Sequence, residues 1–154
     1  MKILLPIDGS AVCLEAVRFA IRMAQEGLQC SMVLANVQEP ATLYEWVVAH
    51  DQQVIEEASA AAGAHTLAAA QALLDTSGIT YECEVAMGDP AHTLIDILEN
   101  FQCDLVVMGA SGMSTLRSAL LGSVSNEVLH AAGVPVVIVK AVEPAEPAET
   151  DEVE

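Results

Sequence analysis

The sequence predicts an α/β fold in which one parallel sheet is covered by helices on both faces. Short apolar runs alternate with longer segments of helical periodicity, which is the pattern of repeated strand–helix units. The later runs, at 104–108 and 134–140, are apolar on both faces, as strands between two helical layers must be. Five strands joined by right-handed crossovers form a doubly wound sheet. A chain of 154 residues suits a single domain with a two-sided core.

The first half of the chain is predicted to contain two strands and two helices. Ser10 is a suitable N-cap for the first helix, and Gly27 is a suitable residue to end it. Pro40 ends the second strand, and Gly78 ends a long alanine-rich helix in which Gly63 is expected to introduce strain. In order, the predicted elements are strand 2–7, helix 11–26, strand 30–37 and helix 46–76.

The second half is predicted to continue the alternation with three strands and two helices. Asp89 as N-cap, with Pro90 at the first helical position, indicates where a helix begins. The chain from Ala141 to Glu154 alternates proline, alanine and acids, so we expect a disordered acidic tail after a folded domain over 1–140. In order, the predicted elements are strand 79–86, helix 89–100, strand 104–109, helix 123–132 and strand 134–140.

The stretch after the fourth predicted strand is glycine-rich and leads into a helix. Residues 109–112 read Gly-Ala-Ser-Gly, and nine residues later the chain continues with Gly122-Ser123. Glycines let a backbone approach a phosphate closely, and a helix start offers unpaired N–H groups. The motif lacks the Lys of a P-loop, and it does not follow the first strand as G-x-G-x-x-G does. It predicts a phosphate site; a turn needed only for chain geometry is the alternative.

The spacing G-x-x-G-x9-G-[ST] resembles the nucleotide loop of the universal stress protein family. The resemblance covers roughly residues 1–140 and implies the strand order 3-2-1-4-5. In that order the topological switch lies between the first and fourth strands, where open α/β sheets bind ligands. The other segments that resemble the family are Lys2–Ser10 for the first strand and its Asp turn, Val33–Val37 for the second strand, Gly88–Pro90 for the start of the third helix, and Val134–Lys140 for the closing strand.

The resemblance implies that ATP, or AMP or ADP, binds in this crevice, with Mg²⁺ as a further candidate. Asp8 would hold Mg²⁺ or accept a hydroxyl; alternatively it starts a turn and caps the first helix. Arg117 would contact phosphate or remain a solvated cation, and Ser123 would bind phosphate, cap the next helix, or do both. The backbone of Val37 would meet the adenine edge, and no catalytic residue is assigned. The full set of expected contacts is Pro6, Ile7, Asp8, Val37, Met108, Gly109, Gly112, Arg117, Gly122, Ser123, Val124 and Ser125.

Three positions depart from the residues that are usual in the family. Asn36 stands where many members have His, and Gly9 stands where many have a bulky residue. Ser111 stands where many have His or Arg. These departures concern the details of base and phosphate contact rather than the fold.

The charge and the cysteines restrict the partners and the compartment that we expect. The net charge is −17, from 22 acidic and 5 basic residues, and such a surface repels nucleic acids and anionic lipids. We expect no nucleic-acid partner, no membrane span and a cytoplasmic location. The four cysteines show neither C-x-x-C nor zinc-ligand spacing, so buried reduced thiols are expected.

Three functions compete at this stage. The first is an adenine-nucleotide-binding regulatory protein of the stress response, acting as a dimeric sensor. The resemblance implies a homodimer, and the apolar strand 134–140 would pair with its mate. The second is a slow ATPase or autophosphorylating enzyme, which the lack of a P-loop Lys and of an evident base disfavours. The third is a nucleotide-independent protein–protein interaction module, which the retained glycine loop disfavours.

Overall fold

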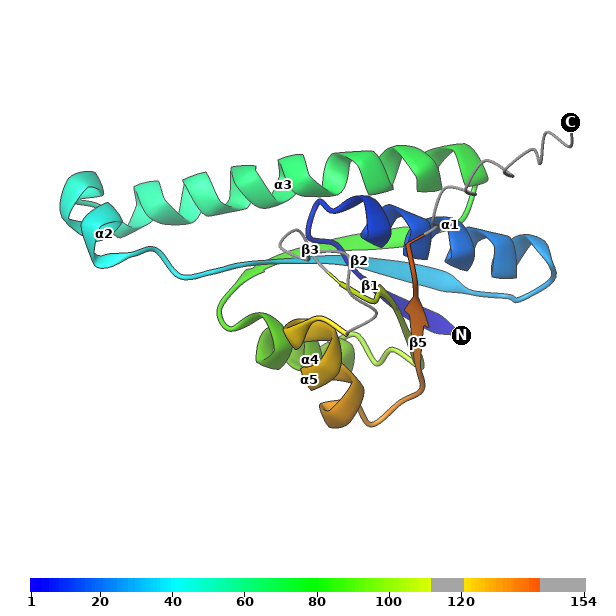
Figure 1. Ribbon diagram of the computed structural model, residues 1–154. Helices are drawn as coiled ribbons and strands as arrows, with labels where there is room; N and C mark the ends of the chain where they lie inside the picture. The colour runs from blue at the N-terminus through cyan, green and yellow to red at the C-terminus, as the bar shows by residue number, and fades with distance from the viewer. Residues whose placement is uncertain (112–120, 142–154) are drawn as a thin grey trace, which may run out of the picture.

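The computed structural model describes residues 1–111 and 121–141. The elements in these ranges are β1 Lys2–Pro6, α1 Ala11–Gln25, β2 Ser31–Gln38, α2 Leu43–Ala49, α3 Gln52–Ser77, β3 Tyr81–Met87, α4 Pro90–Asn100, β4 Leu105–Gly109, α5 Ser123–Ala131 and β5 Val136–Val139. All strand pairs are parallel, and the sheet order is β3-β2-β1-β4-β5. Figure 1 shows α1 and α3 on one face of the sheet and α4 and α5 on the other. The predicted fold class and strand order are confirmed.

Two apolar cores lie on opposite faces of the sheet, because successive side chains of a strand point to opposite sides. In β1, Ile3 and Leu5 belong to the core under α1 and α3, whereas Leu4 belongs to the core under α4 and α5. All three side chains are buried. A continuous apolar run is therefore what a strand between two helical layers requires, as the sequence pattern indicated.

The predicted helix over 46–76 is wrong at its start, because two helices occupy this part of the chain. A capping box at Thr42 and Glu45 begins α2, and His50 ends it with a positive φ of 54°. Asp51 then caps α3 by accepting a hydrogen bond from the Gln53 N–H. Figure 1 shows the short α2 at the far end of α3. Local capping thus overrides the alanine-rich pattern that predicted one continuous helix.

Gly63 does not strain α3, contrary to expectation, and the helix runs through it without a break. Instead, this buried glycine faces the sheet. A Cβ atom at this position would overlap the Cγ1 methyl of Val85 and lie 3.0 Å from the Asn36 side-chain oxygen. Gly63 therefore allows α3 to pack closely over β2 and β3.

The predicted N-caps at Ser10 and Asp89 are confirmed, since each side chain accepts a backbone N–H of the first helical turn. The expectation of buried thiols holds only in part. Cys13 and Cys103 are buried and Cys30 is half-buried, but Cys83 is exposed on the edge strand β3. Among the helices that the structure describes, none is long and apolar enough to cross a membrane.

Candidate functional site

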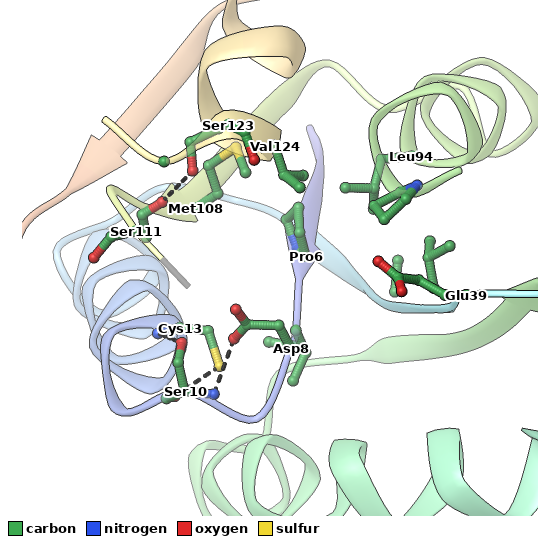
Figure 2. Close-up of a pocket in the computed structure, with 17 residues that line it drawn as sticks. Pro6, Asp8, Ser10, Cys13, Glu39, Leu94, Met108, Ser111, Ser123 and Val124 are labelled. Atoms are coloured by element: carbon green, nitrogen blue, oxygen red, sulfur yellow. Dashed lines mark hydrogen bonds between the residues drawn. The ribbon is translucent and has the colours of Figure 1, made fainter. Parts of the chain in front are cut away.

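A pocket of about 420 Å³ lies at the carboxyl ends of β1, β2 and β4. It is bordered by the N-terminal turns of α1, α4 and α5, so it occupies the topological switch between β1 and β4. Figure 2 shows the side chains that line it. Two of the expected contacts, Gly112 and Arg117, lie outside the described residues, as do residues 142–154 of the acidic tail expected over 141–154. The other ten line the pocket: Pro6, Ile7, Asp8, Val37, Met108, Gly109, Gly122, Ser123, Val124 and Ser125.

Sequence reasoning missed several residues that also line the pocket. Glu39 follows the carboxyl end of β2, so the rule that led to Asp8 after β1 could have found it. Pro90 and Leu94 come from the start of α4. Asp89 as N-cap predicts that helix start from the sequence but does not indicate that it borders the crevice. The remaining ones are Ser10, Cys13, Ala35 and Ser111.

The turn after β1 presents Asp8 to the pocket. One carboxylate oxygen of Asp8 accepts the Ser10 N–H at 2.9 Å, so the predicted turn role is present. The side chain is nevertheless exposed and lines the pocket, and it is therefore also placed to meet a ligand. The N-cap of α1 is Ser10, so Asp8 forms the turn but does not cap the helix. Turn formation and ligand contact are compatible, because a carboxylate has two oxygens that can accept several hydrogen bonds.

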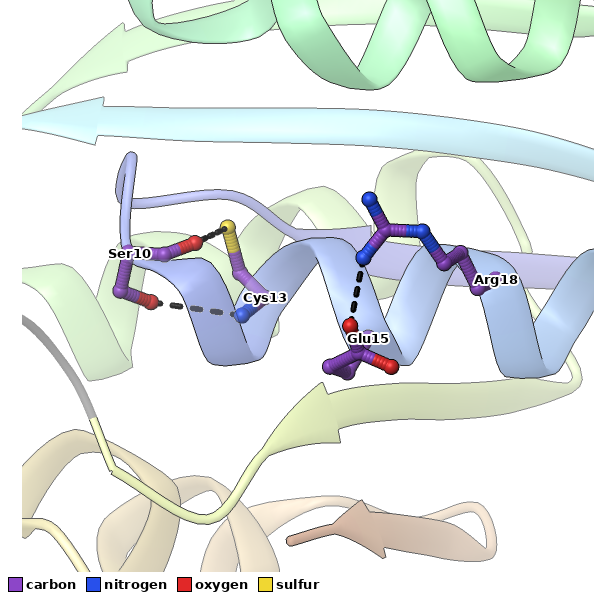
Figure 3. Close-up of polar contacts among 4 residues, drawn as sticks. All are labelled: Ser10, Cys13, Glu15 and Arg18. Carbon is purple, nitrogen blue, oxygen red and sulfur yellow. Dashed lines mark hydrogen bonds and ion pairs between the residues drawn. The ribbon is translucent and has the colours of Figure 1, made fainter. Parts of the chain in front are cut away.

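The first turn of α1 forms the floor of the pocket beside Asp8. Figure 3 shows the Ser10 hydroxyl accepting the Cys13 N–H at 3.3 Å and the Cys13 thiol donating to the Ser10 carbonyl at 3.0 Å. Burial raises the pKa of the Cys13 thiol. Cys13 therefore lines the pocket as a neutral, weakly polar group rather than as a thiolate. One turn further on, outside the pocket, Figure 3 also shows the ion pair of Arg18 with Glu15.

The end of β2 offers backbone groups on the side that β1 no longer covers. Pairing of the two strands ends with Pro6 opposite Ala35, and the Ile7 N–H donates to the Ala35 carbonyl at 2.8 Å. Alternate residues of a strand turn their N–H and C=O groups to the same side. Those of Val37 therefore point past the end of β1, into the pocket that Val37 lines. The backbone N–H donor and C=O acceptor of Val37 lie side by side, which suits hydrogen bonding to the edge of a purine.

Asn36, which stands where the family resemblance leads us to expect His, is buried and hydrogen-bonded through both its amide nitrogen and its oxygen. Its amide nitrogen donates to the Ile7 carbonyl at 2.8 Å, and its oxygen accepts from the Gln38 side chain at 2.6 Å. Asn36 does not line the pocket. It holds the chain after β1 against β2 and so positions Ile7 and Val37 on either side of the opening.

The N-terminus of α5 forms the opposite wall. Gly122 is the N-cap, so the expectation that Ser123 caps this helix is wrong, and no side-chain cap hydrogen bond occurs at this end within the described chain. The N–H groups of Ser123 and Val124 belong to the first turn, where the helix itself supplies no acceptor. Both residues line the pocket, so this end combines orphan donors with the positive end of the helix dipole.

Ser125 has a structural role that the sequence did not reveal. Its buried hydroxyl donates to the Gly109 carbonyl at 2.8 Å, so it ties the start of α5 to the end of β4. Because the proton of this hydroxyl is committed, a contact of Ser125 with phosphate would come from its backbone N–H. The Gly122 N–H strengthens the same junction by donating to the Ala110 carbonyl at 2.7 Å.

The pocket has a polar asymmetry. Figure 2 shows Asp8 and Glu39 away from Ser123, so two carboxylates face an end that is rich in N–H donors. Apolar side chains of Pro6, Leu94 and Met108 lie between them. Such a site suits a ligand with an anionic group at one end and a flat, largely apolar body at the other.

The family model for universal stress proteins matches residues 1–140. The chain belongs to the universal stress protein family. Among its relatives is the universal stress protein MJ0531 of Methanocaldococcus jannaschii. It is 31% identical over 139 residues, which span 90% of this chain and 81% of that protein. The strand order β3-β2-β1-β4-β5 of this chain is the one that the family resemblance implied.

Solved structures show the same fold. The M. jannaschii protein MJ0577 superposes with a TM-score of 0.78 at 23% identity, covering 93% of this chain and 97% of that one. A universal stress protein solved in complex with cAMP superposes with a TM-score of 0.63 at 26% identity, covering 90% of this chain and 95% of that one. The first of these likenesses concerns the fold alone, whereas the second is with a protein that holds an adenine nucleotide.

Proposed function

We propose that this universal stress protein binds an adenine nucleotide in the crevice between β1 and β4 and acts as a nucleotide-dependent regulator of the stress response. One juxtaposition carries the proposal. The start of α5 at Ser123 and Val124, which no described side chain caps, offers N–H donors for phosphate, across a single pocket from the outward-facing backbone of Val37. The cAMP complex of a family member supports an adenine ligand.

Within this proposal, the base lies near Pro6, Leu94 and Met108, with its edge hydrogen-bonded to the backbone of Val37. The phosphates lie at the glycine loop and the start of α5. Asp8 accepts a ribose hydroxyl or, with a polyphosphate, holds Mg²⁺, because a bare carboxylate would repel the phosphates. The residues present fit a nucleotide of one to three phosphates, ATP, ADP or AMP.

The regulatory role also requires a proposal for how the protein assembles and where in the cell it acts. We propose a homodimer through 134–140, since β5 is an edge strand whose outer backbone groups can pair with a second copy. We also propose a cytoplasmic location, which four unpaired cysteines suit. The domain that binds and dimerises spans 1–140, and the acidic segment over 141–154 keeps it soluble.

The test begins with acid extraction of freshly purified protein, to identify any nucleotide that it carries. Calorimetric titration with ATP, ADP, AMP and cAMP follows, each with and without Mg²⁺. Gly122→Val should abolish binding, because it adds a branched side chain at the phosphate end. Gly122 has φ −63°, so the substitution leaves the backbone unstrained.

Two results would contradict the proposal. A protein that carries no nucleotide and ignores all four would make the glycine loop a structural turn. Rapid, saturable ATP hydrolysis that Asp8→Ala abolishes would make the protein an enzyme rather than a sensor. Thr42→Ala, which alters a cap outside the pocket, serves as the control for folding and should leave nucleotide binding unchanged.

A further inference from the structure

An apolar helix face lies exposed at one end of the molecule. Four side chains of α2 are each more than half exposed. They fall at positions i, i+1, i+4 and i+5 of the helix, so they occupy one side of it. Figure 1 shows α2 at the tip of α3, beyond the body of the sheet. The four residues, called the α2 face below, are Leu43, Tyr44, Val47 and Val48.

The α2 face serves no packing role within the described chain. None of the residues of α2 is buried, and the helix begins with a capping box at Thr42. Val54, on the first turn of α3, is a further half-exposed apolar residue close to α2 in the sequence. Large apolar patches on a protein surface mark interaction sites, because leaving them in water costs free energy that a partner can recover.

The chain on both sides of this apolar surface is acidic. The residues from 42 to 57 contain four exposed acids and neither lysine nor arginine. The occupant that fits must therefore be apolar on one side and basic around it. The four acids are Glu45, Asp51, Glu56 and Glu57.

A second copy of this chain does not fit the same description. A symmetric pairing through the α2 face would bring two identical acidic rims together in a molecule of net charge −17. Anionic lipid surfaces are repelled for the same reason. Electrostatic complementarity therefore selects a basic partner.

We propose that the α2 face is a docking site for a basic amphipathic helix of another protein. Its apolar side would pack on Leu43, Val47 and Val48, and its lysines or arginines would lie against Glu56 and Glu57. In such a contact the apolar anchors supply affinity and the flanking charges supply orientation. The proposal does not depend on nucleotide, and it concerns a surface separate from the pocket.

Trp46 provides the measurement, since it is the only tryptophan of the chain and lies partly exposed on α2. The full-length protein is titrated without nucleotide with a synthetic amphipathic peptide of leucine and lysine. A leucine–glutamate peptide of the same pattern, and a leucine–lysine peptide of scrambled order, are the matched probes. Only the amphipathic basic peptide should shift Trp46 fluorescence to shorter wavelength and saturate.

Variants distinguish specific docking from general attraction to an acidic protein. Val47→Ser with Val48→Ser should weaken binding by about tenfold or more. Leu129→Ser, which alters a partly exposed apolar residue on α5, should leave it unchanged. Glu56→Gln with Glu57→Gln should weaken binding and reduce its dependence on salt. All these side chains are at least partly exposed, and circular dichroism verifies that each variant folds.

Several results would overturn the proposal. Equal binding of the scrambled peptide, or affinity that is unaffected by the two serine substitutions, would show that net charge alone attracts the peptide. A Trp46 shift with zwitterionic lipid vesicles would make the face a membrane contact. A shift on concentrating the protein alone, with a doubled mass that the serine variant loses, would make it a self-association surface.

Discussion

The side-chain amide of Asn36 donates to the carbonyl of Ile7 at 2.8 Å, at the point where β1 and β2 part. In a continuing parallel ladder that carbonyl would accept the N–H of Val37. Because Asn36 satisfies it instead, the Val37 N–H is left facing the pocket. One buried amide thus both ends the strand pairing and keeps a backbone donor available to a ligand.

Replacement of the Asn36 side-chain amide should lower the stability of the protein and also the order of the pocket. Asn36→Ala leaves the Ile7 carbonyl without its buried donor, and we expect a loss of about 1–3 kcal/mol in the free energy of unfolding. Urea denaturation measures it. Gln38→Ala is the control, because it removes only the second hydrogen bond of Asn36 and leaves the Ile7 carbonyl satisfied. Equal losses in the two variants would contradict a special role for Ile7.

Gly63→Ala should destabilise the protein, although the same change usually stabilises a helix by about 1 kcal/mol. The new methyl group would overlap the Cγ1 methyl of Val85, and such overpacking costs about 1–3 kcal/mol. Thermal and urea unfolding both report the sign. Val85→Ala should relieve the clash, so the double variant should be more stable than the sum of the two single effects predicts. A stabilised Gly63→Ala protein would show that the helix and sheet are not in close contact there.

Ser125→Ala should loosen the start of α5. The buried hydrogen bond to the Gly109 carbonyl is lost, and the expected cost is about 1–3 kcal/mol in unfolding free energy. Ser123→Ala is the matched control, since its side chain is exposed and its removal should change stability by less than about 0.5 kcal/mol. Amide hydrogen exchange should accelerate over 123–131 in the first variant only. Similar exchange in both would mean that α5 is held by its apolar contacts alone.

Tyr81 should ionise only at an unusually high pH. Its hydroxyl donates to Asp75 at 2.6 Å, and this hydrogen bond raises the pKa of Tyr81 to about 12. The folded state therefore favours the protonated phenol; this contribution is complete below the ordinary tyrosine pKa of about 10. It is lost as the pH rises through about 12.

Absorbance of tyrosinate checks this, in a Tyr44→Phe background that leaves one tyrosine. Asp75→Ala should move the ionisation of Tyr81 to lower pH and remove the alkaline loss of stability. An unchanged titration curve would mean that the Asp75 hydrogen bond does not persist in solution.

Val136→Pro should separate dimers if the proposed strand pairing is correct. Val106 donates to the Pro135 carbonyl and Ala110 donates to the Val139 carbonyl, so alternate residues of β5 face β4. The N–H of Val136 points to the outer edge, and proline removes it without breaking a bond to β4. Sedimentation should show monomers for this variant and dimers for Val136→Thr, which keeps the N–H. Dimers in both would place the interface elsewhere.

The sheet was predictable because its signals are local and strong. Buried strands such as β1 and β4 are apolar on both faces, and Ser10 and Asp89 carry the side chains that cap helices. The strand order was not available from periodicity, and it came from the resemblance of the glycine loop. Pocket residues after β1 and β4 followed from that order, because carboxyl ends of neighbouring parallel strands meet.

The misses have a common physical origin, which is that short-range capping and long-range pairing leave weak traces in composition. The alanine-rich pattern predicted one helix from 46 and missed the capping box at Thr42 and Glu45, which lies before that pattern begins. No pattern could show that the Ser125 hydroxyl is committed to Gly109, since the two are brought together only by folding. Likewise, the exposure of Cys83 depends on β3 being an edge strand.

Because α2 contains no buried residue, its sequence is constrained differently from that of the core and the crevice. Changes in the core or the crevice must preserve folding and ligand contact at once. Changes on α2 leave both untouched, because surface substitutions of this kind barely alter stability. Duplicated copies of such a chain can therefore diverge in their binding partners, while they inherit the same fold and the same crevice.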